Sequence, residues 1–356
     1  METLNLLSLL SVDQIYFGTM LHRSALPCIC CECSEGFNMS RAFVFPGQGA
    51  QSIGMGKALA AAYPAAKAVF DEVDDALGEP LSDLIWSGDP DVLTLTKNAQ
   101  PALMATSLAG MRALEAEGVT MTAADYVAGH SLGEYSALAA SGAISLSDTA
   151  RLLRTRGSAM QEAVPVGVGA MAALLGLDFD TVVSLAAEAA HGQVCQAAND
   201  NDPGQVVVSG DKAAVERAIE LAKTKGAKRA ILLPVSAPFH CALMAPAADI
   251  MAQALAEVAI VSPALPLIAN VLAEPVTDPD EIRQLLVAQV TGVVRWRETV
   301  SWLGAHGVTD IWEIGAGKAL SGMVRRIERS IACRAVSTPE DVASAVQNFE
   351  NSWAEE

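Results

Sequence analysis

The chain has 356 residues, of which 51% are hydrophobic and 18% are charged. This composition excludes disorder over most of the length and leaves room for one large domain, or for a domain with a smaller insert. Acidic residues outnumber basic ones by 41 to 23, which gives a net charge of −18. Such a balance argues against nucleic acid as the partner, because phosphate binding needs clustered cations.

Residues 1–38 differ in character from the rest of the chain. They hold four of the seven cysteines, in the pattern Cys28-x-Cys30-Cys31-x-Cys33, and show no helical or strand period. One interpretation is a metal clip, but structural zinc sites usually pair C-x₂₋₄-C with a second pair further on. We therefore prefer either a disordered extension or a translated leader upstream of a true start at Met39, and we expect no metal.

Targeting signals are weak. The start, Met1-Glu2-Thr3-Leu4, lacks the basic residues of a secretory signal. The longest apolar run, 163–177, is 15 residues long and contains one proline and three glycines, whereas a membrane helix needs about 20 apolar residues. The scattered cysteines outside the first segment favour a reducing compartment. We expect a cytoplasmic protein that does not contact a membrane.

From Arg41 onward, predicted strands and helices alternate, which is typical of an α/β layer fold. A strand at 42–45 is followed by helices to about 77, and a helix at 98–117 by a strand at 126–129. Helices at 132–141 and 147–164 complete the first part. Residues 165–232 then read β-α-β-β-α-β, with strands at 169–175, 193–198, 205–209 and 229–233 and helices at 178–191 and 211–226.

This order is typical of a ferredoxin-like arrangement. After it, the alternation resumes to the end of the chain, with a strand at 310–314 and a helix at 318–329. We therefore predict an α/β-hydrolase-like core with a parallel sheet, made of residues 39–164 and 233–356. The ferredoxin-like small subdomain would be inserted at 165–232.

The segment Gly129-His130-Ser131-Leu132-Gly133 is a G-x-S-x-G motif between a predicted strand and a predicted helix. The two glycines let the chain turn sharply, so that the serine hydroxyl is exposed at the carboxyl edge of the sheet. The following helix directs its N-terminal amides toward any oxyanion that forms there. The string alone is weak evidence, because it also arises by chance. Its strand–turn–helix context favours Ser131 as a nucleophile.

A nucleophilic serine needs a base, and the chain has five histidines. His22 lies in the doubtful first segment, and His130 adjoins the serine within the turn. His191 and His306 each precede a glycine at a predicted helix end, where a histidine interacts favourably with the helix dipole and needs no catalytic role. His240 remains, in a non-helical stretch. A lone histidine in apolar surroundings is usually a core residue, but elimination favours His240 as the base.

Several segments in this order resemble the malonyl-CoA:acyl carrier protein transacylases of type II fatty acid synthesis. The resemblance runs from Met39 almost to the end, and its motifs are specific when taken together. They are Phe45-Pro46-Gly47-Gln48-Gly49-Ala50-Gln51, Asn98-Ala99-Gln100-Pro101-Ala102-Leu103, Gly129-His130-Ser131-Leu132-Gly133-Glu134-Tyr135, Arg156-Gly157-Ser158-Ala159-Met160-Gln161, Asn199-x-Asn201-x-Pro203-Gly204-Gln205, Pro238-Phe239-His240 and Glu313-Ile314-Gly315-x-Gly317-Lys318.

The resemblance implies a ping-pong acyltransferase that passes through a malonyl-serine ester, with Ser131 as nucleophile and His240 as general base. It also implies an oxyanion hole formed by the backbone N–H groups of Gln48 and Leu132. In the family a main-chain carbonyl orients the histidine, and the matching position is Gln289, in Gln289-x₅-Arg295-Trp296.

Arg156 is the candidate for binding the free carboxylate of a malonyl group. A planar guanidinium meets a carboxylate with two parallel charge-assisted hydrogen bonds. The alternative is a solvated arginine on a surface helix beside Arg151 and Arg154, although helical spacing turns Arg154 and Arg156 about 200° apart. Phe239 resembles the bulky residue of malonyl-selective members. Asn199 resembles a residue that lines the cleft, but a plain Asx turn before Pro203 is an alternative.

The partners that this interpretation implies are malonyl-CoA and an acyl carrier protein, with no cofactor and a monomeric chain. An acidic carrier protein would need a local basic patch for transient docking. The candidate cations are Lys318, Arg325, Arg326 and Arg329, or Lys223, Lys225, Lys228 and Arg229. Two other functions stay open: an esterase or thioesterase that uses the same serine, and a non-catalytic docking module.

Overall fold

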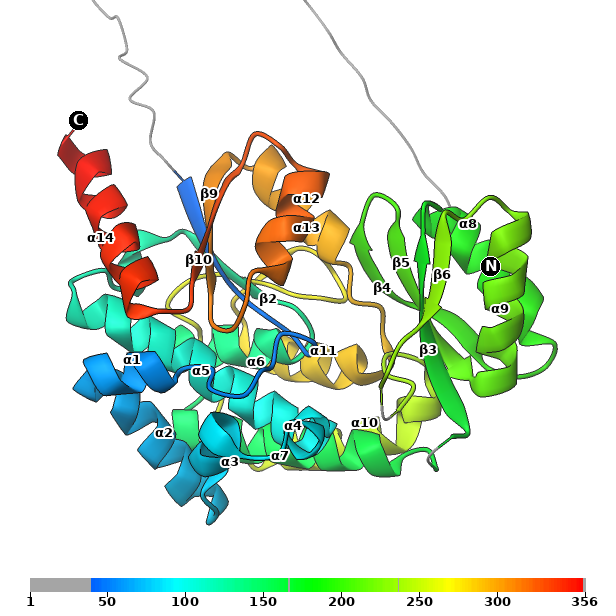
Figure 1. The fold of residues 1–356 in the computed structure, drawn as a ribbon, viewed down its shortest axis with the longest axis horizontal. Helices are drawn as coiled ribbons and strands as arrows, with labels where there is room; N and C mark the ends of the chain where they lie inside the picture. Colours follow the sequence, from blue (N-terminus) through cyan, green and yellow to red (C-terminus); the bar gives the residue numbers. More distant parts are fainter. Residues whose placement is uncertain (1–39, 166, 236, 355–356) are drawn as a thin grey trace, which may run out of the picture. The chain divides into compact units, whose positions relative to one another are not determined.

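The computed structural model describes residues 40–354 except 166 and 236, so the cysteine cluster and His22 lie outside the described residues. The described residues belong to the larger of the two units into which the chain divides. Within the larger unit, two sheets form the framework (Figure 1). The mixed α/β class predicted from the sequence is confirmed.

The larger sheet has six strands in the order β10-β9-β1-β2-β7-β8. All neighbouring pairs are parallel except β7 with β8, which are antiparallel. The strands are β1 (Ser40–Phe45), β2 (Tyr126–Gly129), β7 (Leu267–Ile268), β8 (Pro275–Val276), β9 (Val308–Ile314) and β10 (Ala332–Val336). Because β1 and β2 are neighbours and parallel, their carboxyl ends bring the loop after Phe45 beside the loop after Gly129.

Both faces of this sheet are covered, and β1 shows why. Its residues alternate in direction, so Phe43 and Phe45 join one apolar cluster while Ala42 and Val44 join another. The first cluster lies beneath the long helices, and the second is closed by Trp296, Val300 and other residues of the later helices. Two faces buried in this way account for the continuous apolar run of the strand.

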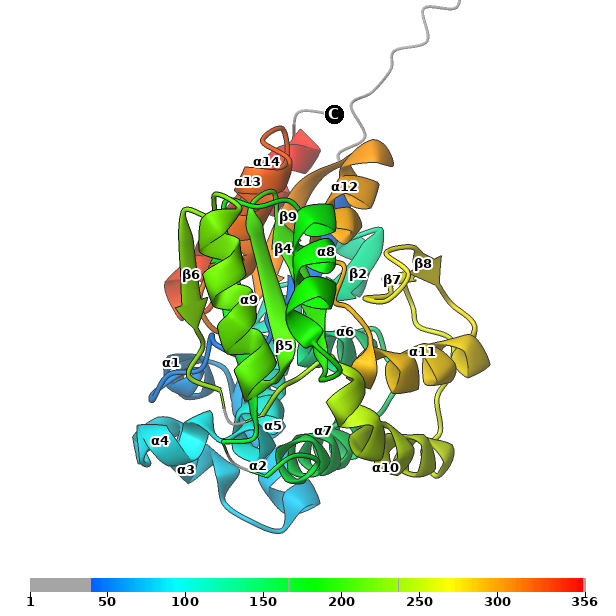
Figure 2. The same cartoon turned by 90° about the vertical axis from the view of Figure 1, so that its right-hand side faces the viewer.

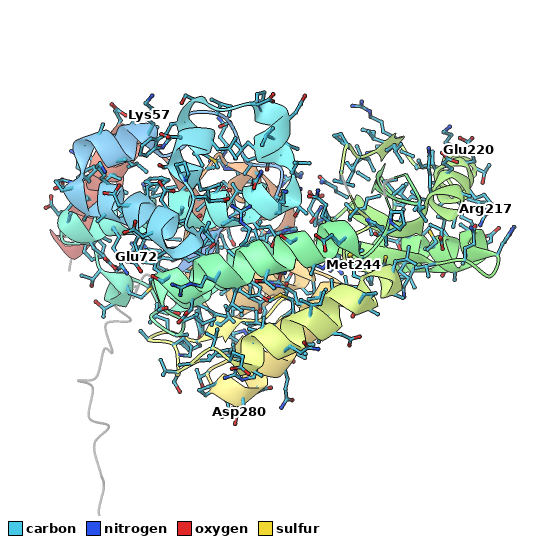
Figure 3. All side chains as sticks on the ribbon, turned by 90° about the horizontal axis from the view of Figure 1, so that it is seen from below. Lys57, Glu72, Arg217, Glu220, Met244 and Asp280 are labelled. Carbon is cyan, nitrogen blue, oxygen red and sulfur yellow. The ribbon has the colours of Figure 1, made fainter. Side chains whose placement is uncertain are left out.

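The helices of the core flank these strands. They are α1 (Lys57–Ala62), α2 (Pro64–Leu77), α3 (Leu81–Ser87), α4 (Pro90–Thr94), α5 (Thr96–Ala116), α6 (Leu132–Ala140), α7 (Leu146–Glu162), α10 (Ala245–Ala256), α11 (Pro279–Thr291), α12 (Trp296–Ala305), α13 (Ala319–Ile327) and α14 (Pro339–Ala354), with short 3₁₀ turns at Met121–Ala123 and Ala242–Met244. Helices α7 and α10 run side by side, and Asp280 lies at the lower border of the molecule in Figure 3.

The smaller sheet is antiparallel, in the order β4-β5-β3-β6. Its elements follow one another as β3 (Gly169–Leu175), α8 (Phe179–Ala190), β4 (Cys195–Asp202), β5 (Gln205–Asp211), α9 (Lys212–Thr224) and β6 (Arg229–Leu232). Helices α8 and α9 pack on one face and bury a separate apolar cluster (Figure 2). The β-α-β-β-α-β order matches the order expected from the sequence.

Strand β4 is longer than expected, since it continues through Asn199 to Asp202 instead of ending at 198. The Asx turn considered at this point is therefore not formed. The extension is stabilised by Val294, which lies between α11 and α12. Asp200 N–H donates to the Val294 carbonyl, and Val294 N–H donates to the Ala198 carbonyl. This exchange makes Asn199 and Val294 a parallel bridge between the small sheet and the core.

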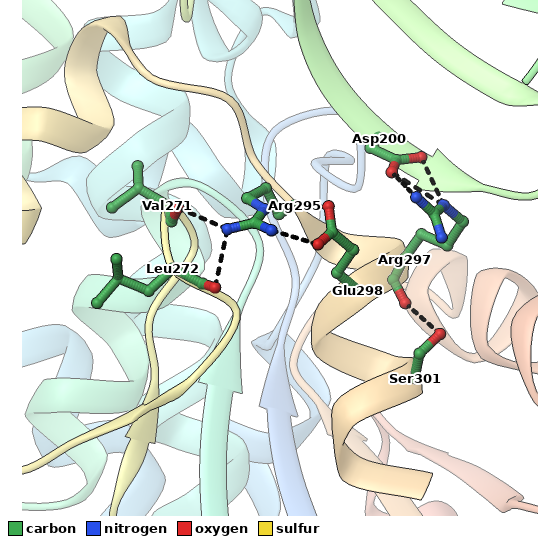
Figure 4. A network of polar contacts seen from close by, with 7 residues as sticks. All are labelled: Asp200, Val271, Leu272, Arg295, Arg297, Glu298 and Ser301. Carbon is green, nitrogen blue, oxygen red and sulfur yellow. Dashed lines mark hydrogen bonds and ion pairs between the residues drawn. The ribbon is translucent and has the colours of Figure 1, made fainter. Parts of the chain in front are cut away.

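Two arginines of the α12 region reinforce that junction (Figure 4). Arg297 pairs with the buried Asp200 of β4, at 2.7 Å from Nη2 to Oδ2. Arg295 Nη1 donates to the carbonyls of Val271 and Leu272, so the loop after β7 is fixed to the start of α12. The strand that carries Asn199 and the loop that carries Asn270 therefore share one support.

The first strand is anchored by a buried ion pair, which yields a stability prediction. Arg41 Nε lies 2.9 Å from Asp310 Oδ2, both residues are 4% exposed, and the guanidinium lies 4.7 Å from the Trp312 ring centroid. Removing one partner of a buried pair costs about 3–5 kcal/mol. Arg41→Ala should lower the free energy of unfolding by that amount in urea titrations.

The matched control is Lys67→Ala, which breaks an exposed i,i+4 pair with Asp71. That change should lower the free energy of unfolding by less than about 1 kcal/mol. Equal losses in the two variants would contradict the importance of burial for the Arg41 pair.

Candidate active site

Ser131 lies at the turn between β2 and α6, as the N-cap of that helix, and its backbone has φ 55° and ψ −111°. A non-glycine residue in this region is strained, and such strain is typical of functional sites. The two flanking glycines are needed for close approach rather than for flexibility. A Cβ on Gly129 would lie 1.9 Å from the Gly133 carbonyl carbon, and one on Gly133 would lie 2.2 Å from the Phe45 carbonyl oxygen.

His240 meets the serine from the connection that returns from the small subdomain. Its Nε2 lies 2.8 Å from Ser131 Oγ. His240 has a φ of 58°, so both members of this pair have a positive φ, which side-chain-bearing residues rarely adopt. Fixing both residues in unfavourable conformations requires tight packing around them, and His240 is 4% exposed.

The imidazole is oriented by the end of α11. His240 Nδ1 lies 2.9 Å from the Gln289 carbonyl oxygen and 3.2 Å from the Gly292 carbonyl oxygen. The last carbonyls of a helix lack intrahelical donors and carry partial negative charge. Since a carbonyl oxygen only accepts, Nδ1 holds the proton and Nε2 faces the serine hydroxyl as an acceptor.

The histidine is held in its neutral form. Burial, followed by the nearby charge of Arg156, lowers the pKa of His240 to about 3. An imidazole that is unprotonated at neutral pH can accept the serine proton directly.

The side chain of Arg156 extends from α7 toward Ser131 and is 1% exposed. Its Nη1 donates to Gln100 Oε1 at 2.7 Å, and its Nη2 donates to Gln289 Oε1 at 2.7 Å and to Ser131 Oγ at 3.2 Å. Arginine has no acceptor, so both glutamine amides must turn their oxygens toward it. The guanidinium is thus held by neutral groups, with no carboxylate in hydrogen-bonding contact among the described residues.

The NH₂ groups of the two glutamine side chains make further hydrogen bonds on the sides away from Arg156. Gln100 Nε2 donates to Thr96 Oγ1, and the Thr96 hydroxyl donates to the Gln48 side-chain oxygen, both at 2.8 Å. On the other side, Gln289 Nε2 donates to Glu134 and to the Ser131 carbonyl. One series of hydrogen bonds therefore joins the loop after β1, Arg156 and the turn that carries Ser131.

A cavity of about 380 Å³ opens over Ser131. Its walls come from the core, from β3 and β4, and from the connection after β6. The lining residues are Gln48, Gly49, Gln51, Thr94, Gln100, His130, Ser131, Leu132, Arg156, Met160, Met171, Asn199, Leu233, Pro234, Val235, Phe239 and His240.

The structure brings the predicted site residues together. Ser131, His240, Arg156, Gln48, Leu132, Phe239 and Asn199 all line the cavity. Gln289 is fully buried behind His240 and contacts it through the predicted main-chain carbonyl. Leu132 is the first residue of α6, where helix amides have no intrahelical acceptor.

Sequence reasoning missed four contributors. His130 lines the cavity and its Nε2 lies 2.9 Å from Asn201 Oδ1, although it was set aside as the neighbour of the serine in the turn. Gln100 and Glu134 stand in recognised motifs, but no role was assigned to them. Asn270 had no sequence signal; its Oδ1 accepts from the Ser131 N–H at 2.8 Å and its Nδ2 donates to the Gly129 carbonyl.

No group of three or more His, Cys, Asp or Glu side chains that could hold a metal occurs in the described part of the chain. Over the same residues, no helix combines the length and apolar character that crossing a bilayer requires.

The lowered pKa of His240 makes stability depend on pH. The unfolded chain binds this proton near the ordinary histidine pKa of 6.5, and the folded chain binds it only at a pKa of about 3. His240 thus contributes stability above pH 6.5 that is lost as the pH falls toward 3. Between pH 7.5 and pH 5 the loss should be about 2 kcal/mol. We expect urea unfolding of wild type to show this loss beyond any loss seen in His240→Gln.

The variant retains His130, whose pKa is also lowered by burial, so the comparison isolates His240. Parallel losses in the two proteins would show that the folded chain protonates His240 as readily as the unfolded chain does.

Known proteins give an independent assignment. A family model described as an acyl transferase domain matches residues 42–320. The malonyl CoA-acyl carrier protein transacylase of Bacillus subtilis is 48% identical over 309 residues, which are 86% of this chain and 96% of that protein. The crystal structure of an acyl-carrier-protein S-malonyltransferase from Bartonella henselae is 56% identical, with a TM-score of 0.86 over 88% of this chain and 100% of that one.

A second similar structure is a malonyl transacylase in complex with its type II polyketide synthase acyl carrier protein. It is 42% identical, with a TM-score of 0.84, and covers 87% of this chain and 99% of that one. Identity of this degree over almost the whole length of the relatives settles the family. The chain belongs to the malonyl-CoA:acyl carrier protein transacylases, a family of acyltransferase enzymes.

Proposed function

We propose that this acyltransferase moves the malonyl group from malonyl-CoA to the phosphopantetheine thiol of an acyl carrier protein by a ping-pong route, for fatty acid synthesis. The observation that carries the proposal is the position of Ser131 Oγ, within hydrogen-bonding distance of both His240 Nε2 and Arg156 Nη2. One contact serves deprotonation, and the other lies where the distal carboxylate of a bound malonyl group would be.

In the first half-reaction, Ser131 Oγ attacks the thioester carbonyl while its proton moves to His240 Nε2. The backbone N–H groups of Gln48 and Leu132 stabilise the tetrahedral oxyanion, and one such donor is typically worth about 10² to 10³ in rate. The carbon–sulfur bond then breaks, and CoA leaves as the thiol with the proton from His240. A malonyl-serine ester remains.

In the second half-reaction, the phosphopantetheine thiol gives its proton to His240 and attacks the ester. The carbon–oxygen bond to Ser131 breaks, and the serine recovers its proton from His240. No metal or redox cofactor takes part in this scheme. Water must be kept from the ester, and the apolar wall that Phe239, Leu233 and Val235 contribute supports that requirement.

Arg156 would bind the malonyl carboxylate. Its Nη2 contact to Ser131 Oγ is long, at 3.2 Å, and among the described residues Nη1 donates to Gln100 alone. A carboxylate can therefore take one N–H from each terminal nitrogen, which is the bidentate arrangement. Phe239 is 8% exposed and would narrow the space beside the α-carbon, while Asn199 would contribute a polar group to the same cavity.

The carrier protein would dock transiently on a basic patch. The complex of a similar transacylase with its acyl carrier protein supports this class of partner. Three of the eight candidate cations are occupied within the chain, because Lys223, Lys225 and Arg326 pair with Glu220, Glu188 and Asp202. We favour the surface of Lys318, Arg325 and Arg329, and a monomeric enzyme.

The domain division is part of the proposal. An α/β-hydrolase-like core at 39–164 and 233–356 is supported by the parallel pairing of β10, β9, β1, β2 and β7. A ferredoxin-like subdomain at 165–232 is supported by the antiparallel order β4-β5-β3-β6. The active site would then lie where the insert meets the core.

The malonyl-serine ester can be tested by intact mass spectrometry. Brief exposure to malonyl-CoA without carrier protein should add one malonyl group, which holo-acyl carrier protein then removes. Ser131→Ala should show no adduct, because the only proposed nucleophile is gone. Steady release of CoA without an adduct would indicate a thioesterase, and neither adduct nor CoA would indicate a docking module.

The carboxylate role of Arg156 can be tested by comparing acylation with malonyl-CoA and acetyl-CoA. Arg156→Ala should lower the malonyl-to-acetyl ratio of kcat/KM about a hundredfold or more, since it removes the partner of a buried charge. Arg154→Ala is the matched control, because Arg154 lies on the same helix and bonds Glu79 and Asn98 instead. An unchanged ratio in Arg156→Ala would remove the carboxylate-binding role.

A further inference from the structure

Glu134 is a buried carboxylate beside the site for which the proposed chemistry has no use. It is 1% exposed and lies in the first turn of α6, three residues after Ser131. At this position a glutamate commonly reaches back to the N–H of the N-cap residue. Here the Ser131 N–H instead donates to Asn270 Oδ1, so Glu134 is not the cap of its own helix.

Both carboxylate oxygens are used elsewhere. Oε2 accepts from Gln289 Nε2, and Oε1 accepts from the Asn270 backbone N–H at 3.3 Å. Glutamate, as an acceptor at both oxygens, is matched to two donors that approach from different loops. The contact to Gln289 is the one that bears on the proposed substrate site.

Gln289 has an amide that could in principle point either way. With Nε2 on Glu134 and on the Ser131 carbonyl, its Oε1 must face Arg156 Nη2. The opposite orientation would set an NH₂ group against the guanidinium, and neither could accept. The carboxylate thus holds the Gln289 amide from one side, and the amide oxygen holds one edge of the arginine.

We propose that Glu134 is a positioning residue for malonyl selectivity, which acts through the Gln289 amide to hold Arg156 in the orientation that receives a carboxylate. The inference rests on the proposed role of Arg156. It adds that the selectivity of the enzyme depends on a residue that contacts neither the substrate nor the arginine.

The electrostatics agree with an indirect arrangement. A carboxylate in direct contact would occupy the N–H groups that the substrate needs, whereas Glu134 is one amide away. Burial raises the pKa of Glu134 to about 7, while the hydrogen bonds from Gln289 and Asn270 and the charge of Arg156 act in the opposite direction. Because Glu134 contacts the Gln289 amide and not the guanidinium, it takes none of the Arg156 N–H groups that a substrate carboxylate would need.

The test measures the malonyl-to-acetyl ratio of kcat/KM in single-turnover acylation. Glu134→Met, which has similar volume and no carboxylate, should lower the ratio about tenfold, mainly through KM for malonyl-CoA. Glu134→Gln keeps one acceptor and should lie between wild type and Glu134→Met. Glu313→Met is the matched control: Glu313 is a buried carboxylate that accepts from two backbone N–H groups of the α13 region, so its loss should leave the ratio unchanged.

Two further variants keep the proposal falsifiable. Gln289→Met removes the amide and keeps the carbonyl that orients His240, so it should reproduce the fall in the ratio even if Glu134→Met does not fold. In an Arg156→Ala background, Glu134→Met should produce no further fall. If Arg156→Ala alone leaves the ratio unchanged, the proposed function of Arg156 fails. If Arg156→Ala collapses the ratio while Glu134→Met and Gln289→Met slow both substrates equally, only the positioning role is overturned.

Discussion

The burial of a positive charge among neutral partners is the constraint on which this site depends. Arg156 is 1% exposed and is held by Gln100, Gln289 and Ser131. An isolated buried ion is very unfavourable unless hydrogen bonds satisfy it. Two amide oxygens accept from the terminal nitrogens without neutralising the charge, so the guanidinium can still gain from an incoming anion.

The orientation of the neighbouring groups follows from that constraint. Because arginine can only donate, the amides of Gln100 and Gln289 have a single allowed orientation, and each then determines the next partner. From Gln100, the series of hydrogen bonds continues through Thr96 to Gln48, whose backbone is a proposed oxyanion donor. From Gln289, it continues to the turn of Ser131. Binding of the acyl group and activation of its carbonyl are thus supported by one network.

The base is oriented by equally neutral means. His240 is held by two carbonyls at the end of α11 and has no acidic partner in the described part of the chain. A carboxylate in that place would raise the pKa of the imidazole and would compete with the substrate for Arg156. A helix end supplies directed acceptors with only partial charge, which suits a site that must attract a single anion.

The sequence predicted much of this arrangement, and the physical reasons for its successes and failures are clear. Strand β2 and strand β3 were placed at their observed bounds, because apolar runs ending at glycine are local signals. The end of β4 was missed because its last residues are stabilised by Val294, nearly 100 residues away in the chain. Asn270 was missed for the same kind of reason, since it accepts from the Ser131 N–H only because the loop after β7 packs against the turn between β2 and α6.

The side chains behind the site were beyond sequence reasoning for a different reason. Gln100 and Glu134 stand in sequence motifs, but their hydrogen-bond partners depend on the orientation of two side-chain amides, those of Gln100 and Gln289. That orientation is decided by the donors around it and not by the residue types in one segment. Sequence patterns in a single chain therefore identify the reacting groups more easily than they identify the residues that hold those groups in place.

The connection from Leu233 to His240 has a consequence for how such an enzyme can diversify. Leu233, Pro234, Val235 and Phe239 form one wall of the cavity, while His240 at the end of the same segment is tied to α11 in the core. Changes in the wall can therefore reshape the space for the acyl chain while the anchored imidazole stays in register with Ser131. Within a few consecutive residues, the chain separates the part that can vary with the substrate from the part that the reaction requires to be constant.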